Sequence, residues 1–184
     1  MLVGELSPPA PGSLVLDLTA APGGKATHLA SHLQGKGLLV TNDPHPGRVQ
    51  ALSRNLERWG ARSAVVTSET PGRLADFWGA IFDQVYVDAP CSGEGMFRTS
   101  QSEINHWSPS LVERSAALQD EILWHAARLV RPGGALIYST CTFSPRENEG
   151  SLSRFLESRD DFRIEAVPAI EGVSPGKPEW GTGL

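Results

Sequence analysis

The sequence predicts an α/β fold, a mostly parallel β-sheet with helices on both faces. Short apolar runs typical of buried strands alternate with longer stretches that have the spacing of amphipathic helices. Strands that alternate with helices pair in parallel, and such sheets are covered on both faces. Ligands of these sheets bind beyond the carboxyl ends of the strands. The residues best suited to chemistry stand at or just after such ends: Asp17, Asp43, Asp88, Cys91 and Cys141.

Composition limits the class of protein. The chain has 184 residues, 40% of them hydrophobic and 20% charged, which suits a single globular domain and excludes a disordered or fibrous chain. No apolar run reaches membrane-spanning length and no signal peptide is recognisable at the start, so we expect a cytoplasmic protein. Two cysteines exclude a disulfide scaffold and a cysteine-rich zinc module, and we expect no metal site. The net charge of −5 does not by itself indicate a nucleic-acid partner.

Five strands are predicted from short apolar runs, and Phe162–Val167 is a candidate sixth. Each of the five is bounded by glycine, proline or polar turn residues. The five strands are expected at Leu14–Leu18, Gly37–Asn42, Ser63–Thr67, Phe82–Asp88 and Ala135–Ser139.

Helices are predicted between these strands. The first follows a glycine turn and ends near Leu33, and the second, Gly47–Trp59, carries Val49, Leu52, Leu56 and Trp59 on one face. A polar loop over Ala89–Asn105 leads to a helix that starts at Ser108-Pro109 and ends at Pro132-Gly133-Gly134. Its inward residues are expected to be Leu111, Leu118, Ile122, Ala126 and Leu129.

The remaining segments complete the organisation of the chain. Ser144-Pro145-Arg146-Glu147 has the form of a capping box, which would open a last helix through about Glu157. We expect residues 1–13 to be a linker or the remnant of an N-terminal segment, 14–170 to be the core domain, and 171–184 to be an irregular tail.

A nucleotide-type pocket is predicted at the first two strands. Thr19-Ala20-Ala21-Pro22-Gly23-Gly24-Lys25 forms a glycine turn between the first strand and its helix, where the backbone can approach a ligand. Asp43, at the end of the second strand, is placed to hydrogen-bond a pair of ribose hydroxyls. The alternative is a simple tight turn, with Asp43 only capping a helix.

The same turn argues against phosphate-bearing ligands. It lacks the G-x-G-x-x-G pattern of dinucleotide-binding sites and the spacing of a P-loop, and Pro22 stiffens the place where a pyrophosphate needs backbone amides. A nucleoside ligand without phosphates fits better, and this favours S-adenosylmethionine.

Two cysteines follow the fourth and fifth strands. If these strands are neighbours, about 4.8 Å apart, Cys91 and Cys141 project over the same edge of the sheet. A thiolate that adds to carbon 6 of cytosine makes carbon 5 nucleophilic enough to attack a sulfonium methyl group. The adduct must then lose the proton on carbon 5 and expel the thiol, and a second, basic group nearby is useful for this step. Asp88 is a candidate for stabilising the protonated ring. The alternatives are two buried cysteines that act as small hydrophobes, or a disulfide.

Three strings carry a resemblance to a known family. DLTAAPGGK, DAPCSGEGMFR and YSTCTF, in this order and spacing, resemble the Sun-type RNA (cytosine-5) methyltransferases, and within them the bacterial ribosomal-RNA branch. The resemblance extends from Leu14 into the tail. It implies a Rossmann-like class I fold that uses S-adenosylmethionine to methylate carbon 5 of cytosine in RNA, most readily ribosomal RNA.

The resemblance also assigns residues. Cys141, in T-C-T, would be the nucleophile, and Cys91, in P-C-S, would assist release of the methylated product. Cofactor contacts would fall on Thr19, Ala20, Ala21, Pro22, Gly23, Gly24, Lys25, Asp43, Asp88 and a residue near Glu69.

The sequence departs from the family pattern in three respects. Thr19 stands where the family often has cysteine, few residues precede the first strand, and no candidate for a final antiparallel strand follows Val167. The expectation is therefore a truncated catalytic core, whose local phosphate contacts would be Arg98, Arg114 and Arg146. Two alternatives stay open: a cofactor-binding module without activity of its own, and a DNA cytosine-5 methyltransferase that uses Cys91.

Overall fold

The computed structural model describes residues 2–181, which form two compact units. The sheet unit comprises the chain up to Asp88 together with His125–Tyr138, and the loop unit comprises Ala89–Trp124 and the chain from Ser139 onward. Met1 and residues 182–184, on which the ends of the expected linker and tail fall, lie outside the described residues.

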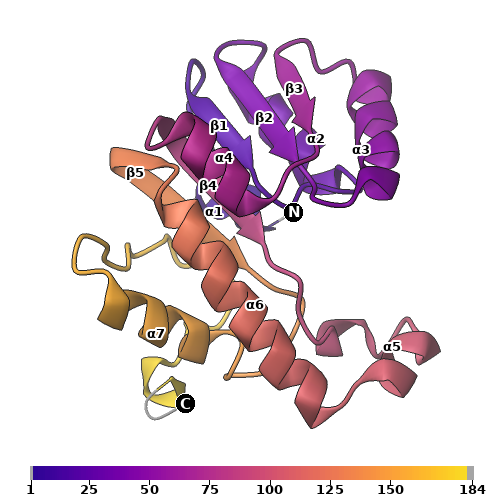
Figure 1. Ribbon diagram of the computed structural model, residues 1–184, viewed down its shortest axis with the longest axis vertical. Coiled ribbons are helices and arrows are strands. Elements are labelled where there is room, and N and C mark those ends of the chain that lie inside the picture. Colours follow the sequence, from indigo (N-terminus) through magenta and orange to yellow (C-terminus); the bar gives the residue numbers. More distant parts are fainter. Residues whose placement is uncertain (1, 182–184) are drawn as a thin grey trace. The chain divides into compact units, whose positions relative to one another are not determined.

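A five-stranded sheet in the order β3-β2-β1-β4-β5 organises the sheet unit (Figure 1). The pairs β1–β2, β1–β4 and β2–β3 are parallel, which confirms the predicted sheet. Its strands are β1 (Leu14–Asp17), β2 (Leu38–Asn42), β3 (Ala64–Thr67), β4 (Phe82–Asp88) and β5 (Val130–Ser139).

Helices precede, connect and follow these strands. Those before β4 are α1 (Leu2–Leu6), α2 (Gly24–Leu33), α3 (Pro46–Trp59) and α4 (Pro71–Trp78). The later ones are η1 (Glu94–Met96), α5 (Gln101–His106), α6 (Pro109–Ala127), α7 (Glu149–Ser158) and η2 (Pro178–Trp180). The short helix α1 falls in the segment for which a linker was expected. No helix of the described chain combines the length and the apolar character that crossing a membrane requires.

The central strands β1, β2 and β4 are largely buried on both faces, whereas the outer strands β3 and β5 are partly exposed. On one face Val15 and Leu39 pack against Leu29 and Leu33 of α2. The adjacent row, formed by Leu16, Val40 and Val85, points to the opposite face and is buried as well. Burial and parallel pairing thus place the carboxyl ends of β1, β2, β3 and β4 at the same edge of the sheet.

Several predicted elements need correction. Phe162–Val167 is irregular, not a strand, and Ile164 and Val167 are more than half exposed because no buried face receives them. Among the described residues, no strand follows β5. Trp59 and Leu118, which were expected to face inward, are exposed to 60% and 43%.

The fifth strand starts five residues earlier than predicted. The Pro132-Gly133-Gly134 segment does not end the helix but lies inside β5. A Cβ on Gly134 would lie 2.8 Å from the carbonyl oxygen of Asp83 and 3.0 Å from that of Phe82. Glycine is needed there because the backbones approach so closely.

Helix α4 was not predicted from the sequence, although the residues at its start have a recognisable helix-capping pattern. Thr70 accepts a hydrogen bond from the Arg73 N–H at 3.4 Å, and Pro71 occupies the first helical position. The segment predicted to be a polar loop also contains helical structure, since η1 and all but the last residue of α5 lie within it.

Candidate functional site

In the sheet unit, the loop after β1 is built for close backbone approach. Gly23 has a φ of 111°, a conformation that favours glycine, and the Ala21–Pro22 peptide bond is cis. The backbone carbonyls of this loop are held from α3: Arg48 Nη2 donates to Ala21 O at 2.8 Å, and Asn55 Nδ2 donates to Pro22 O at 2.7 Å. The loop is thus fixed by neighbouring side chains as well as by its own sequence.

Asp43 is buried directly after β2. One carboxylate oxygen accepts the His45 N–H at 3.0 Å, and the other lies 3.4 Å from Arg48 Nη1. That second oxygen accepts no hydrogen bond among the described residues. A buried acceptor without a hydrogen bond is rare, so this oxygen, which has only the ion pair with Arg48, fits the role of receiving a ligand hydroxyl.

Asn42 joins the ends of β2 and β3. Its side-chain amide donates to Glu69 O at 2.9 Å and to Leu18 O at 3.1 Å, and its oxygen accepts the Glu69 N–H at 3.0 Å. Asn42 is completely buried and was not singled out from the sequence. It places the Glu69 backbone beside Asp43, whose carbonyl accepts from Ser68 at 3.2 Å. The Glu69 side chain itself pairs with Arg73 at 3.1 Å.

The end of β4 is tied to the glycine loop. Thr19 Oγ1 accepts the Asp88 N–H at 2.9 Å and donates to Asp88 O at 3.0 Å. The Asp88 carboxylate forms an ion pair with Lys25 Nζ, and both side chains are about one-third exposed. Thr19, Lys25 and Asp88, all predicted site residues, therefore meet at one point.

Asp17 accepts a backbone hydrogen bond from Thr19, interacts electrostatically with Asp88 and Lys25, and is almost completely buried. Burial raises its pKa to about 7, and the negative charge of Asp88 adds to the effect, while Lys25 opposes it. Its Oδ2 accepts no hydrogen bond among the described residues.

In the loop unit, the two cysteines meet. Cys91 Sγ and Cys141 Sγ are 3.1 Å apart, and Cys91 Sγ also accepts the Cys141 N–H at 3.3 Å. They are not joined by a disulfide; Cys141 is exposed and Cys91 is partly buried, which contradicts the alternative of two buried hydrophobes. The hydrogen bond with Cys141, followed by burial, raises the pKa of the Cys91 thiol far above its usual range. Cys91 is thus held as a thiol that can donate to Cys141.

A buried polar network supports the two cysteine loops. Glu147 accepts from the Ser92 N–H at 2.9 Å, from the Ser92 hydroxyl, and from Gln119 Nε2 at 2.9 Å. Ser92 Oγ also lies 2.9 Å from Thr142 Oγ1, so the residues that follow the two cysteines are bonded to each other. The predicted capping box is therefore wrong: Glu147 reaches Ser92 instead of the backbone of Ser144, and α7 begins at Glu149.

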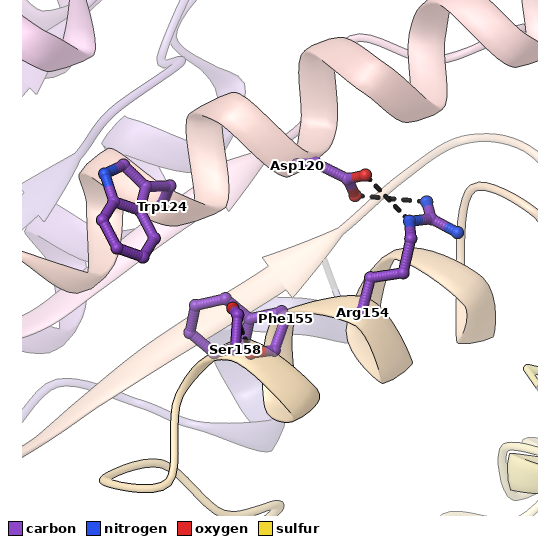
Figure 2. Close-up of a pocket in the computed structure, with 5 residues that line it drawn as sticks. All are labelled: Asp120, Trp124, Arg154, Phe155 and Ser158. Carbon is purple, nitrogen blue, oxygen red and sulfur yellow. Dashed lines mark hydrogen bonds and ion pairs between the residues drawn. The ribbon is translucent and has the colours of Figure 1, made fainter.

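A hollow of about 260 Å³ lies elsewhere in the loop unit, against α6 and α7 (Figure 2). Asp120 and Arg154 form a two-point ion pair at 2.8 and 3.1 Å on its wall, and Trp124, Phe155 and Ser158 complete the lining. None of the predicted site residues lines it. The three arginines predicted to contact phosphate are also not gathered there, and Arg146 pairs with Glu113 at 2.8 Å.

Comparison with known proteins identifies relatives that match most of the chain. Residues 5–179 match the family described as 16S rRNA methyltransferase RsmB/F. The ribosomal RNA small subunit methyltransferase F of Erwinia tasmaniensis is 38% identical over 157 residues, which are 85% of this chain and 33% of that protein. The tRNA (cytosine(49)-C(5))-methyltransferase of Pyrococcus abyssi is 36% identical over 172 residues, 94% of this chain and 55% of that protein.

The fold of this chain is also similar to that of a solved structure. The crystal structure of NSun6 from Pyrococcus horikoshii with SFG superimposes with a TM-score of 0.83 at 29% identity, covering 95% of this chain and 44% of that one. The chain spans about a third of the length of the Erwinia relative and about half that of the Pyrococcus abyssi one.

Proposed function

The chain belongs to the 16S rRNA methyltransferase RsmB/F family, and from this premise we propose that it transfers a methyl group from S-adenosylmethionine to carbon 5 of a cytosine in RNA, ribosomal RNA being the substrate we favour. The observation that carries the proposal is the contact of 3.1 Å between the sulfur atoms of Cys91 and Cys141. These are the chain's two cysteines, and each follows a strand of the sheet. A cytoplasmic location, where ribosomal RNA is made and modified, is part of the proposal.

S-adenosylmethionine is proposed to bind at the carboxyl ends of the strands in the sheet unit. The unsatisfied oxygen of Asp43 would accept the ribose hydroxyls, and the Thr19–Lys25 loop would line the methionine part. The backbone near Glu69, held by Asn42, would border the adenine. SFG, the ligand of the solved relative, is an analogue of S-adenosylmethionine, which supports this choice. The sulfonium compound supplies the electrophilic methyl group.

Cys141 is proposed to be the nucleophile. Its thiolate adds to carbon 6 of the cytosine, and the electron pair that appears at carbon 5 attacks the methyl group, leaving S-adenosylhomocysteine. Cys141 suits this role because it is exposed and because Cys91 is held as a thiol beside it. A hydrogen bond donated by Cys91 would stabilise the Cys141 thiolate before attack.

Cys91 is proposed to remove the proton from carbon 5. The largest cause that raises the pKa of Cys91 is its hydrogen bond with Cys141. Once Cys141 is bonded to carbon, it can no longer exchange this proton with Cys91, and the pKa of Cys91 falls. The Cys91 thiol can then lose its proton to solvent, and the resulting thiolate is available as the base that takes the proton from carbon 5. Loss of the carbon 5 proton re-forms the double bond and expels Cys141 as a thiolate. Asp88, which forms an ion pair with Lys25 in this structure, is proposed to hold the cytosine ring or the cofactor at this stage.

Covalent trapping tests the assignment. The protein and its Cys91→Ala and Cys141→Ala variants are incubated with S-adenosylmethionine and ribosomal RNA, and protein–RNA adducts that survive denaturation are measured. We expect the adduct to accumulate in Cys91→Ala and to be absent in Cys141→Ala. The reverse pattern would make Cys91 the nucleophile, as in DNA cytosine-5 methyltransferases. If no variant gives an adduct while all bind the cofactor, the chain is a binding module without activity of its own.

A further inference from the structure

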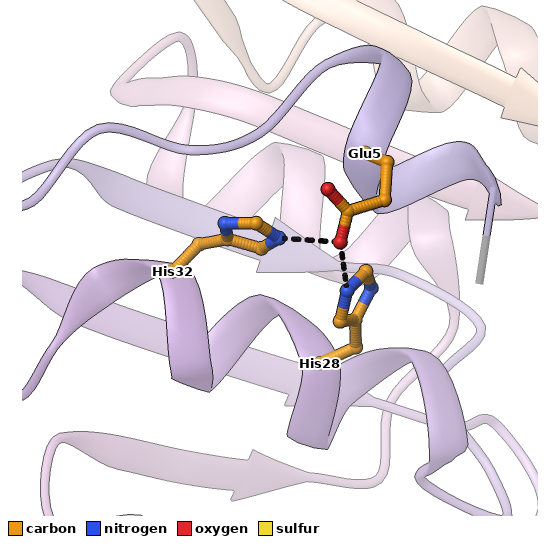
Figure 3. A group of neighbouring side chains, drawn as sticks. All are labelled: Glu5, His28 and His32. Carbon is orange, nitrogen blue, oxygen red and sulfur yellow. Dashed lines mark hydrogen bonds and ion pairs between the residues drawn. The ribbon is translucent and has the colours of Figure 1, made fainter. Parts of the chain in front are cut away.

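Two histidines on α2 face a carboxylate from α1, in the sheet unit (Figure 3). His28 and His32 are one helical turn apart, and their rings lie edge to face with centroids 4.8 Å apart. The Glu5 Oε1 atom is 2.7 Å from His28 Nε2 and 3.5 Å from His32 Nε2. All three ligand-type atoms lie within 4.8 Å of one another.

These distances suit a tetrahedral metal ion. Ligand atoms that sit about 2.0–2.1 Å from a tetrahedral zinc ion are roughly 3.3 Å apart from each other. The observed separations from Glu5 Oε1 bracket this value, and the two imidazole nitrogens lie within 4.8 Å of each other, so side-chain rotations that close this last separation would bring the three atoms around one centre. Two imidazoles and a carboxylate form a common zinc ligand set, with a fourth position open to water.

His32 provides a second observation. Its Nε2 atom is buried and has no hydrogen-bond partner in the described chain. An unsatisfied buried polar atom costs stability unless something outside the protein binds it. In Figure 3 this atom points at the Glu5 carboxylate, the place where a shared ion would sit.

Gly4 permits the approach of α1 to the histidines. A Cβ at this position would lie 2.5 Å from His28 Nδ1 and 2.9 Å from its neighbouring ring carbon. Any larger residue would push the His28 ring out of its present position, away from Glu5. The packing of a five-residue helix therefore depends on the same ring that carries one of the ligand atoms.

We propose that Glu5, His28 and His32 bind a divalent transition-metal ion of the zinc class, which links α1 to α2. Imidazole ligands favour zinc, nickel and copper over magnesium and calcium. The role would be structural, since an ion held by both helices fixes α1 on the sheet unit. None of the residues in the proposed cofactor or cysteine sites is a ligand of this ion. The metal site can therefore be tested independently of the proposed function.

The test must distinguish zinc binding at Glu5, His28 and His32 from zinc binding by the cysteine thiols. Because two neighbouring thiols such as those of Cys91 and Cys141 are themselves potential zinc ligands, the host is tag-free protein carrying Cys91→Ser and Cys141→Ser. Zinc binding is measured by calorimetry, and Co²⁺ is used as a probe whose visible absorption reports tetrahedral coordination. The variants are His28→Ala, His32→Ala, Glu5→Gln and Gly4→Ala, with exposed His106→Ala as the matched control.

We expect the host and His106→Ala to bind one zinc ion, with a tetrahedral Co²⁺ spectrum. Each of the other variants should bind at least tenfold more weakly. Zinc at about 100 times Kd should raise Tm by roughly 5–10 °C in the host but not in Glu5→Gln. Glu5 is largely exposed, so this variant keeps the fold even if a histidine variant does not. Absence of saturable zinc binding in the host, or equal affinity in all variants, would overturn the proposal.

Discussion

Glu147 accepts hydrogen bonds from both the backbone N–H and the hydroxyl of Ser92, the residue that follows Cys91. The carboxylate is completely buried and also accepts from Gln119, which in turn donates to Pro90 O at 2.9 Å. One acidic side chain therefore fixes the backbone on both sides of Cys91. The link from Ser92 Oγ to Thr142 Oγ1 extends this control to the Cys141 loop.

Glu147→Ala should destabilise the protein by about 3 kcal/mol, because it leaves several buried donors without an acceptor. Glu147→Gln should cost only about 1 kcal/mol, since the amide oxygen can still accept from Ser92 N–H and Gln119 while the Ser92 hydroxyl turns to accept. Urea unfolding measures both values. Glu157→Gln, an exposed change on the same helix, is the control and should be neutral. Equal losses for Glu147→Ala and Glu157→Gln would contradict the network.

Removal of Cys141 should lower the pKa of Cys91. The hydrogen bond between the two thiols is the largest cause that raises it, and Cys141→Ala removes this bond but keeps the backbone N–H that favours the Cys91 thiolate. The measurement is the pH midpoint for alkylation of Cys91 by iodoacetamide, followed by mass spectrometry. In Cys141→Ser the hydroxyl can still accept a hydrogen bond from Cys91. The alkylation midpoint of Cys91 in this variant should therefore lie between those of the parent protein and Cys141→Ala. An unchanged midpoint in Cys141→Ala would show that burial alone holds Cys91 protonated.

Asp43→Asn should weaken binding of S-adenosylmethionine by about 10- to 100-fold. The substitution removes the charge that would strengthen hydrogen bonds to the ribose hydroxyls, which are worth roughly 1.5–3 kcal/mol when the acceptor is ionised. The amide keeps an oxygen for the His45 N–H, so the loop should retain its fold. Calorimetric titration gives Kd, with the exposed Asp76→Asn as a control in the same unit. If both variants bind like the parent, Asp43 is not a cofactor ligand.

Much of this arrangement could be predicted from the sequence, because strand ends are marked by local pattern. The apolar runs ending at Asp17, Asn42 and Asp88 are short and bounded by turns, and the sheet placed all three ends at one edge, as parallel pairing demands. The pairing of Cys91 with Cys141 followed from the neighbouring positions of β4 and β5.

Other features depend on contacts between residues far apart in the chain. Asn42 is an ordinary polar residue in sequence, and only the fold reveals that it holds both Leu18 and Glu69. Glu147 matched a local capping pattern, yet tertiary bonding to Ser92 prevailed because a buried carboxylate needs several donors. The Pro132-Gly133-Gly134 segment has the local pattern of a helix end. Only the fold shows that Gly134 is needed inside a strand, because the backbone of Asp83 approaches it closely.

Asp17 should make the protein less stable as the pH rises toward neutrality. Its pKa is about 7 in the folded state, because it is buried near Asp88, and about 3.9 in the unfolded chain. Between these two values the folded state binds a proton that the unfolded state does not. The free energy of unfolding therefore falls as pH increases across this window and levels off above pH 7. The full effect of this one group is on the order of a few kcal/mol.

Asp17→Asn isolates this contribution, because the amide is neutral and similar in size. The variant should gain stability relative to the parent between pH 5.5 and pH 8, by an amount on the order of 2 kcal/mol, when both are unfolded in urea. Titration of histidines affects parent and variant alike, so it cancels from the comparison. Asp161→Asn is the control: its ion pair with Arg159 lowers the pKa of Asp161, so its contribution changes only at more acidic pH. A difference between Asp17→Asn and the parent that is the same at both pH values would mean that Asp17 is already ionised in the folded protein at pH 5.5, and that Lys25 outweighs its burial.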